Sequence, residues 1–162
     1  MSRTLIYLQE HGLDEYAVLK EKTTTATDQF HTLSSRIKEL ETGMSANAEL
    51  QKHIVNYSKT RQVYVDYRKA GHSKKFKALH EADILLHQTA KKHFDTLGLT
   101  KLPTVASLRA DYAPMLEEKK QAYREYRQAR DEMRELLTAK SNVDRLLNIT
   151  DTQPERGTER DI

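Results

Sequence analysis

Residues 108–147 carry a seam whose steps alternate four, three, four, three without a break. This spacing is typical of a helix that lies along another helix over its whole length. The seam comprises Leu108, Tyr112, Met115, Lys119, Ala122, Tyr126, Ala129, Met133, Leu136, Lys140, Val143 and Leu147. The seam contains no nucleophile, metal cluster or phosphate loop. We therefore expect a structural and binding element that is not an enzyme.

The rest of the chain predicts an all-α, coiled-coil-like antiparallel bundle of three helices of about 25–28 residues and one long C-terminal helix. Helix stops and caps are expected at Gly43, Ser45, Gly71, Ser73, Gly98 and Thr104. The bundle should occupy residues 1–148, with the long helix over about 104–148. Residues 149–162 contain Pro154, Gly157 and alternating charges without apolar partners, which predicts a disordered tail.

Antiparallel folding about Gly71 sets a register between the second and third helices. The third helix is expected to present a seam of Phe76, Leu79, Asp83, Leu86, Ala90, Phe94 and Leu97. In this register Arg61 lies opposite Asp83, and these are the charged members of two otherwise apolar seams. We predict that they form a structural ion pair that fixes the register.

Composition limits the compartment and the chemistry. The chain has no cysteine, which suits a reducing cytoplasm and excludes disulfide and thiolate chemistry. Its start turns charged too early for a secretory signal, and no apolar run approaches the roughly 20 residues that span a bilayer. We expect a cytoplasmic protein without a membrane partner.

Two catalytic or metal-binding interpretations are weak. His80, Asp83 and His87 share a predicted helix face and include zinc-binding residue types, but they lack a two-histidine i, i+4 pair. His53, His72 and His93 are scattered along the sequence. The seam tyrosines are ordinary bundle residues with one polar edge. We expect no catalytic residue, no metal and no cofactor.

The positive charge is concentrated where the second helix turns into the third. Residues 59–77 carry seven Lys or Arg side chains against a single acid, Asp66. The residues expected to contact nucleic acid are Lys59, Arg68, Lys69, His72, Lys74, Lys75 and Lys77. Tyr67 and His72 are candidates for stacking on bases. A solvated helix surface is the alternative interpretation of this charge run.

Several strings have a familiar form: LIYLQEHGL at 5–13, IVNYSKTR at 54–61, YRKAGHSKKF at 67–76, LPTV at 102–105 and RELLTAK at 134–140. Together, from about Thr4 to Leu147, they resemble the C-terminal helical region of mobilisation relaxases carried on conjugative elements of Firmicutes. Relaxases nick DNA with a tyrosine and a histidine-bound metal in an N-terminal domain, which is missing here. The resemblance therefore implies an accessory, non-catalytic module that contacts DNA or other proteins of the transfer complex.

Three other interpretations stay open at this point. The chain is a protein–protein adaptor or a homodimer if Met133, Leu136, Val143 and Leu147 form an uncovered seam for a partner. An inhibitor of a host defence nuclease, encoded on a mobile element, is also possible, although such an inhibitor more naturally presents acid than base. A metal-dependent hydrolase at His80, Asp83 and His87 requires bound metal.

Overall fold

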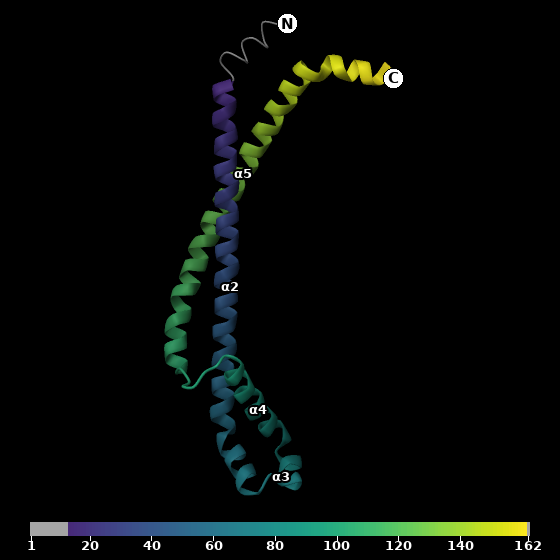
Figure 1. Ribbon diagram of the computed structural model, residues 1–162. Coiled ribbons are helices and arrows are strands. Elements are labelled where there is room, and N and C mark those ends of the chain that lie inside the picture. Colours follow the sequence, from purple (N-terminus) through teal and green to yellow (C-terminus); the bar gives the residue numbers. More distant parts are fainter. Residues whose placement is uncertain (1–12, 162) are drawn as a thin grey trace. The chain divides into compact units, whose positions relative to one another are not determined.

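The computed structural model describes residues 13–161, with side chains described for residues 15–148, and its helices confirm the all-α prediction (Figure 1). No strand occurs in this part of the chain. Over residues 13–161 four helices follow one another, and the last is long, as the sequence predicted. They are α2 at Leu13–Lys69, α3 at Lys74–Leu79, α4 at Glu81–Thr96 and α5 at Val105–Asp161.

The predicted lengths of the first two helices are wrong, because a single 57-residue helix, α2, replaces them. Gly43 and Ser45 were expected to end one helix and cap the next, but both lie inside α2. The reason lies in the packing around them. Leu40, Met44 and Asn47 are all buried, so the seam crosses this segment with its three-and-four spacing intact.

The predicted third helix is divided at His80, which ends α3 and precedes α4. This break changes the face that the segment buries. Ile84, His87, Ala90 and Phe94 are buried in α4. The expected seam residues Leu79, Leu86 and Leu97 are instead 73%, 42% and 52% exposed, so the predicted seam is wrong at these positions.

The predicted turns after α2 and α4 are confirmed. Gly71 and Gly98 have φ angles of 65° and 68°, in the left-handed region where glycine costs least. At each turn a backbone N–H donates to a carbonyl five residues earlier, from His72 to Tyr67 and from Leu99 to Phe94. This pattern is the Schellman ending of a helix.

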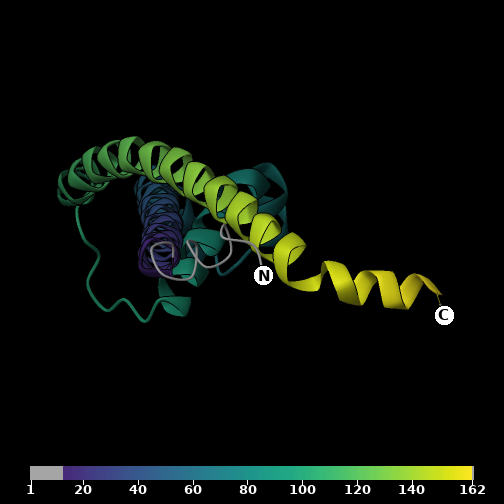
Figure 2. The ribbon, with the colours of Figure 1, turned by 90° about the horizontal axis from the view of Figure 1, so that it is seen from above.

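The predicted helix starts at Ser73 and Thr104 are also confirmed. The Ser73 hydroxyl accepts from the Phe76 N–H at 3.4 Å, and the Thr104 hydroxyl accepts from the Ser107 N–H at 3.0 Å. Between α4 and α5 the chain runs without helix (Figure 2). Leu102 contributes to this, because the proline that follows it disfavours the α conformation. Side-chain caps of this kind satisfy backbone donors that a helix start leaves without partners.

Every position of the predicted α5 seam is buried or half-buried. The two lysines of this seam, Lys119 and Lys140, are half-buried, and each has a carboxylate partner. Lys119 Nζ is 3.5 Å from Glu41 of α2, and Lys140 Nζ is 2.8 Å from Asp144. The seam prediction is therefore confirmed at its charged positions as well as its apolar ones.

The chain divides into two compact units where the sequence predicted one bundle. The first unit comprises residues up to Ile37 and from Gln121 onward, and the second comprises Lys38–Lys120. α5 extends to Asp161, past the end expected near residue 148. The side chains of the predicted disordered tail, residues 149–162, lie outside the described ones.

In the first unit, α2 and α5 run antiparallel with their aromatic and polar seam residues in contact. The rings of Phe30 and Tyr126 lie 4.9 Å apart, and the Tyr16 hydroxyl donates to Asp144. In the second unit, α2 packs against α4 and against the start of α5. Here Asn47 Nδ2 donates to the Leu108 carbonyl at 2.9 Å.

None of the described helices combines the length and the apolar character that crossing a membrane requires.

Candidate nucleic-acid interface

The turn between α2 and α3 is held by an aromatic anchor. Tyr67 is 7% exposed, and its ring contacts the His72 ring edge-on at 4.9 Å and the Phe76 ring at 6.1 Å. His72 has a φ of 58°, so it follows Gly71 in the left-handed region. Because Tyr67 is buried, the expectation that it stacks on bases is wrong, whereas His72 is exposed.

All seven residues predicted to contact nucleic acid are exposed. We call them the hairpin-end cations, although His72 is charged only when protonated: Lys59, Arg68, Lys69, His72, Lys74, Lys75 and Lys77. Lys59 lies ten residues before Lys69 on α2, or about 15 Å along the helix axis. The others flank the turn directly. All belong to the second unit.

The lysines and the arginine of this set form no ion pair with any described carboxylate. The one acid of the segment, Asp66, is half-buried and accepts from the Gln62 side chain at 3.0 Å. Surface charges on most helices are interleaved with opposite charges. An uncompensated cluster of cations around one turn instead produces a positive potential that favours phosphate.

A groove continues this surface between α2 and α4 in the second unit. It has a volume of about 450 Å³ and is lined by Tyr57, Arg61, Tyr64, Val65, Arg68, His87, Gln88 and Lys91. Arg61 and Arg68 line it from α2 and Lys91 lines it from α4. Lys91 is paired with Asp95 at 3.1 Å, so the two arginines carry the uncompensated charge.

Three stacked rings line this groove. The His87 ring lies between Tyr57, at 4.3 Å, and Tyr64, at 4.4 Å, with interplanar angles of 18° and 19°. His87 Nδ1 is 3.0 Å from the Thr60 hydroxyl. Burial lowers the pKa of His87, and a hydrogen bond to the backbone of Tyr57 opposes part of that effect. Burial therefore favours the neutral form of this ring, which packs between the two tyrosines.

The predicted ion pair between Arg61 and Asp83 is not formed in the structure. Arg61 is exposed and lines the groove, whereas Asp83 is half-buried in the first turn of α4. The break at His80 explains the difference, because it directs Ile84 and His87 toward α2. At the N-terminal end of α4, Asp83 is favoured by the helix dipole.

The weak metal candidate from the sequence is not assembled either. His87 is enclosed by two tyrosine rings, and the His80 ring lies against Phe76 at 4.5 Å. Among the described residues the ligand atoms of His80, Asp83 and His87 do not converge. A different set converges instead: Glu49, His53 and His93.

The residues predicted to bind a partner lie in the first unit and are half-buried: Met133, Leu136, Val143 and Leu147. The expectation that this seam is uncovered is wrong, because the first part of α2 lies against it. Leu136 shares a groove with Val18 and Leu19 of α2. Outside the seam, Leu137 and Leu146 are 43% and 51% exposed. Partner binding through this face stays a prediction.

A scan against protein-family models and searches of curated proteins and of solved structures found no match for this chain.

Proposed function

We propose that this chain is a non-catalytic accessory module of a relaxase-like mobilisation protein, and that it binds DNA through the hairpin-end cations. The observation that carries the proposal is the set of exposed, unpaired Lys and Arg side chains around the turn from Gly71 to Ser73. Phosphate contacts by such side chains give affinity without sequence preference.

The string at residues 67–76 supports both parts of the proposal. It carries the most distinctive part of the resemblance to relaxases, and the same residues build the turn. Tyr67 anchors it, Gly71 supplies the left-handed backbone, and Ser73 caps α3. The three lysines of the same string are exposed, so packing of the turn does not require them: Lys69, Lys74 and Lys75.

A salt titration of binding to labelled DNA tests the proposal. Single- and double-stranded DNA are compared for the unaltered chain and for a variant with Lys69, Lys74, Lys75 and Lys77 changed to Glu. For duplex DNA the logarithm of the binding constant falls with the logarithm of salt by about 0.9 per phosphate contact. We expect the variant to lose binding, and single Lys→Ala changes to reduce this slope by up to about 0.9 each.

A second variant separates a local effect from a change in net charge. It changes Lys22, Lys38, Arg127 and Arg134 to Glu, four exposed cations outside the hairpin end. Because both variants alter the net charge equally, the proposal predicts that this control keeps most of the affinity. Equal losses in the two variants would contradict a site at the hairpin end, and no binding by the unaltered chain at low salt would remove DNA from the account.

The rival function is a protein–protein adaptor that uses the first unit. One observation favours it: a groove of about 760 Å³ lies between α2 and α5, bordered by the apolar side chains of Val18 and Leu136. The same groove carries Glu21, Glu132 and Glu135, which disfavour DNA there. A salt-tolerant protein complex that is lost on changing Val18 and Leu136 to Ser would support the adaptor.

A further inference from the structure

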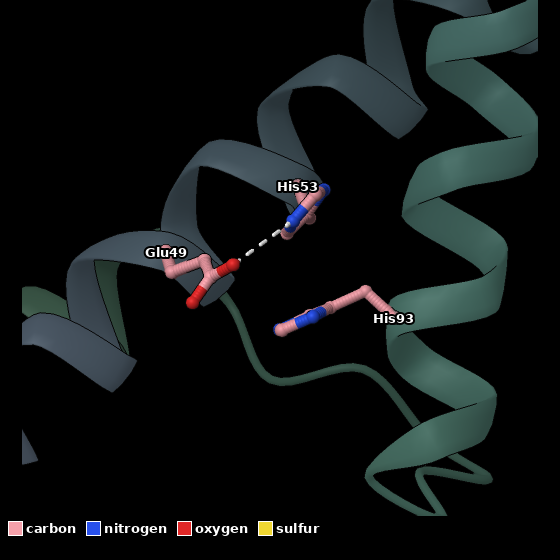
Figure 3. Close-up of side chains that lie close together, drawn as sticks. All are labelled: Glu49, His53 and His93. Carbon is pink, nitrogen blue, oxygen red and sulfur yellow. Dashed lines mark ion pairs between the residues drawn. The ribbon is translucent and has the colours of Figure 1, made fainter.

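Two helices of the second unit bring three possible metal ligands together (Figure 3). Glu49 and His53 are four residues apart on α2, so they share one face of that helix. His93 projects toward them from α4. The ligand atoms of the three side chains all lie within 4.8 Å of one another. Because α2 and α4 both belong to Lys38–Lys120, the cluster lies within a single compact unit.

One ring nitrogen of each histidine has no hydrogen-bond partner in the protein. His53 Nδ1 and His93 Nε2 are buried and have no hydrogen-bond partner. Their rings stack at a centroid distance of 4.3 Å, with an interplanar angle of 27°. Buried ring nitrogens normally have a partner, because an unmade hydrogen bond is costly. Stacking does not supply this partner, because stacked rings meet face to face and hydrogen bonds of ring nitrogens lie in the plane of the ring.

The carboxylate completes a donor set of mixed charge. Glu49 Oε1 lies 3.7 Å from His53 Nε2, longer than a hydrogen bond. The Glu49 side chain is 59% exposed, whereas that of His53 is 14% exposed. The histidines are thus held by helix packing, and the carboxylate is the ligand that has room to adjust. Ligands of a tetrahedral zinc ion lie about 3.3 Å apart, as bonds of about 2.0 Å dictate. The three ligand atoms, which lie within 4.8 Å of one another, therefore move closer together when they bind one ion.

We propose that Glu49, His53 and His93 bind one divalent transition-metal ion, with zinc as the best match. Two imidazoles and one carboxylate suit zinc, whereas magnesium and calcium prefer oxygen ligands throughout. Zinc also has no geometric preference from its d electrons, so its ligands can be placed by helix packing without a strict coordination geometry. Three protein ligands leave a fourth position for water or another ligand.

Such an ion links α4 to α2 through residues forty positions apart, His53 and His93. The site lies on the same two helices as the cationic groove, but it shares no residue with that groove. Metal binding is therefore independent of the proposed DNA contact: a chain that binds no DNA is still expected to bind zinc. The helix pair should become more stable when the ion is bound, since a ligand that binds only the folded state raises its stability.

Zinc titration by calorimetry, together with thermal melting, tests the site on the whole chain after removal of metal by a chelator. We expect one zinc ion per chain and a melting temperature that rises with zinc and does not respond to magnesium. His53→Gln and His93→Gln should each abolish stoichiometric binding and the shift. Glu49→Gln should weaken binding tenfold or more. His31→Gln, at an exposed histidine of the first unit, is the control and should behave like the unaltered chain.

Equal zinc stoichiometry and affinity in the unaltered chain and the two histidine variants would overturn the proposal, as would the absence of a zinc-induced shift in the unaltered chain. If the variants fail to fold, cobalt(II) titration of the unaltered chain decides the question. Intense ligand-field absorption at one cobalt per chain, displaced by zinc, supports a four-coordinate site. A spectrum identical to hexaaqua cobalt overturns it.

Discussion

Gly43 distinguishes a continuous α2 from the two shorter helices that the sequence predicted. If the helix ended there, the glycine would occupy a left-handed position, and replacing it with alanine would destabilise the chain by about 1–2 kcal/mol. In the structure Gly43 lies inside α2 and does not have a positive φ. Alanine in a helix interior is favoured over glycine by about 1 kcal/mol. The two accounts therefore predict opposite signs for Gly43→Ala.

The contact with α5 reduces the expected gain. A Cβ atom at Gly43 would lie 3.3 Å from the sulfur of Met115, slightly closer than ordinary contact. The methionine has several rotatable bonds, and moving its end by a few tenths of an ångström costs roughly 0.5 kcal/mol. We therefore expect Gly43→Ala to raise the free energy of unfolding by about 0.5 kcal/mol.

Gly71 and Gly98 provide matched controls for this experiment. Both have left-handed φ angles, and nothing lies within 4 Å of an added Cβ, so only backbone strain opposes alanine. Gly71→Ala and Gly98→Ala should each lower the free energy of unfolding by about 1 kcal/mol. Urea denaturation followed by circular dichroism measures all three variants. A loss of 1 kcal/mol or more for Gly43→Ala, like that of the controls, would refute a continuous α2.

Three further predictions concern side chains of the second unit. Because burial lowers the pKa of His87, the unfolded chain binds a proton at this residue more readily than the folded chain, so stability should fall as pH drops through about 6.5. Thermal melting of His87→Gln should show a weaker pH dependence. An unchanged pH dependence would contradict this prediction. Thr104→Ala removes the acceptor for the Ser107 N–H and should cost about 1 kcal/mol in urea denaturation, and a loss as small as that of an exposed Thr100→Ala control would exclude a cap. Asn47→Ala removes the buried bond to the α5 backbone and should cost about 1–2 kcal/mol by the same assay; a neutral result would mean that this amide does not hold α5 to α2.

The local features of the fold were predictable from the sequence. The α5 seam was predictable because its spacing is regular over forty residues. The turns at Gly71 and Gly98 and the caps at Ser73 and Thr104 were predictable because glycine and hydroxyl residues have specific roles at helix ends. Exposure of the hairpin-end cations also followed from their residue types.

Features that depend on how helices pack were harder to predict. Gly43 resembles a helix stop in sequence, and its actual environment is set by Met115, which lies far along the chain. No glycine or proline lies next to the break at His80, so the sequence gives no sign of it. The buried face of α4 was therefore predicted wrongly, and the predicted ion pair between Arg61 and Asp83 depended on that face.

The cluster of Glu49, His53 and His93 was missed for the same reason. The i, i+4 spacing of Glu49 and His53 was visible in the sequence. The contribution of His93 depends on the register between α2 and α4. The expected register placed His53 opposite residues 90–91, within one helical turn of His93. An error of less than one helical turn in the predicted register therefore separated His93 from its partners.

Photo-crosslinking from single positions tests the central claim, DNA binding at the hairpin end, most directly. A photoreactive residue replaces Lys75 in one variant and Arg127 in another, two exposed cations in different units. We expect labelled DNA to crosslink from position 75 and not from position 127, and added salt to remove the crosslink. Bound DNA that crosslinks from position 127 and not from position 75 would contradict it.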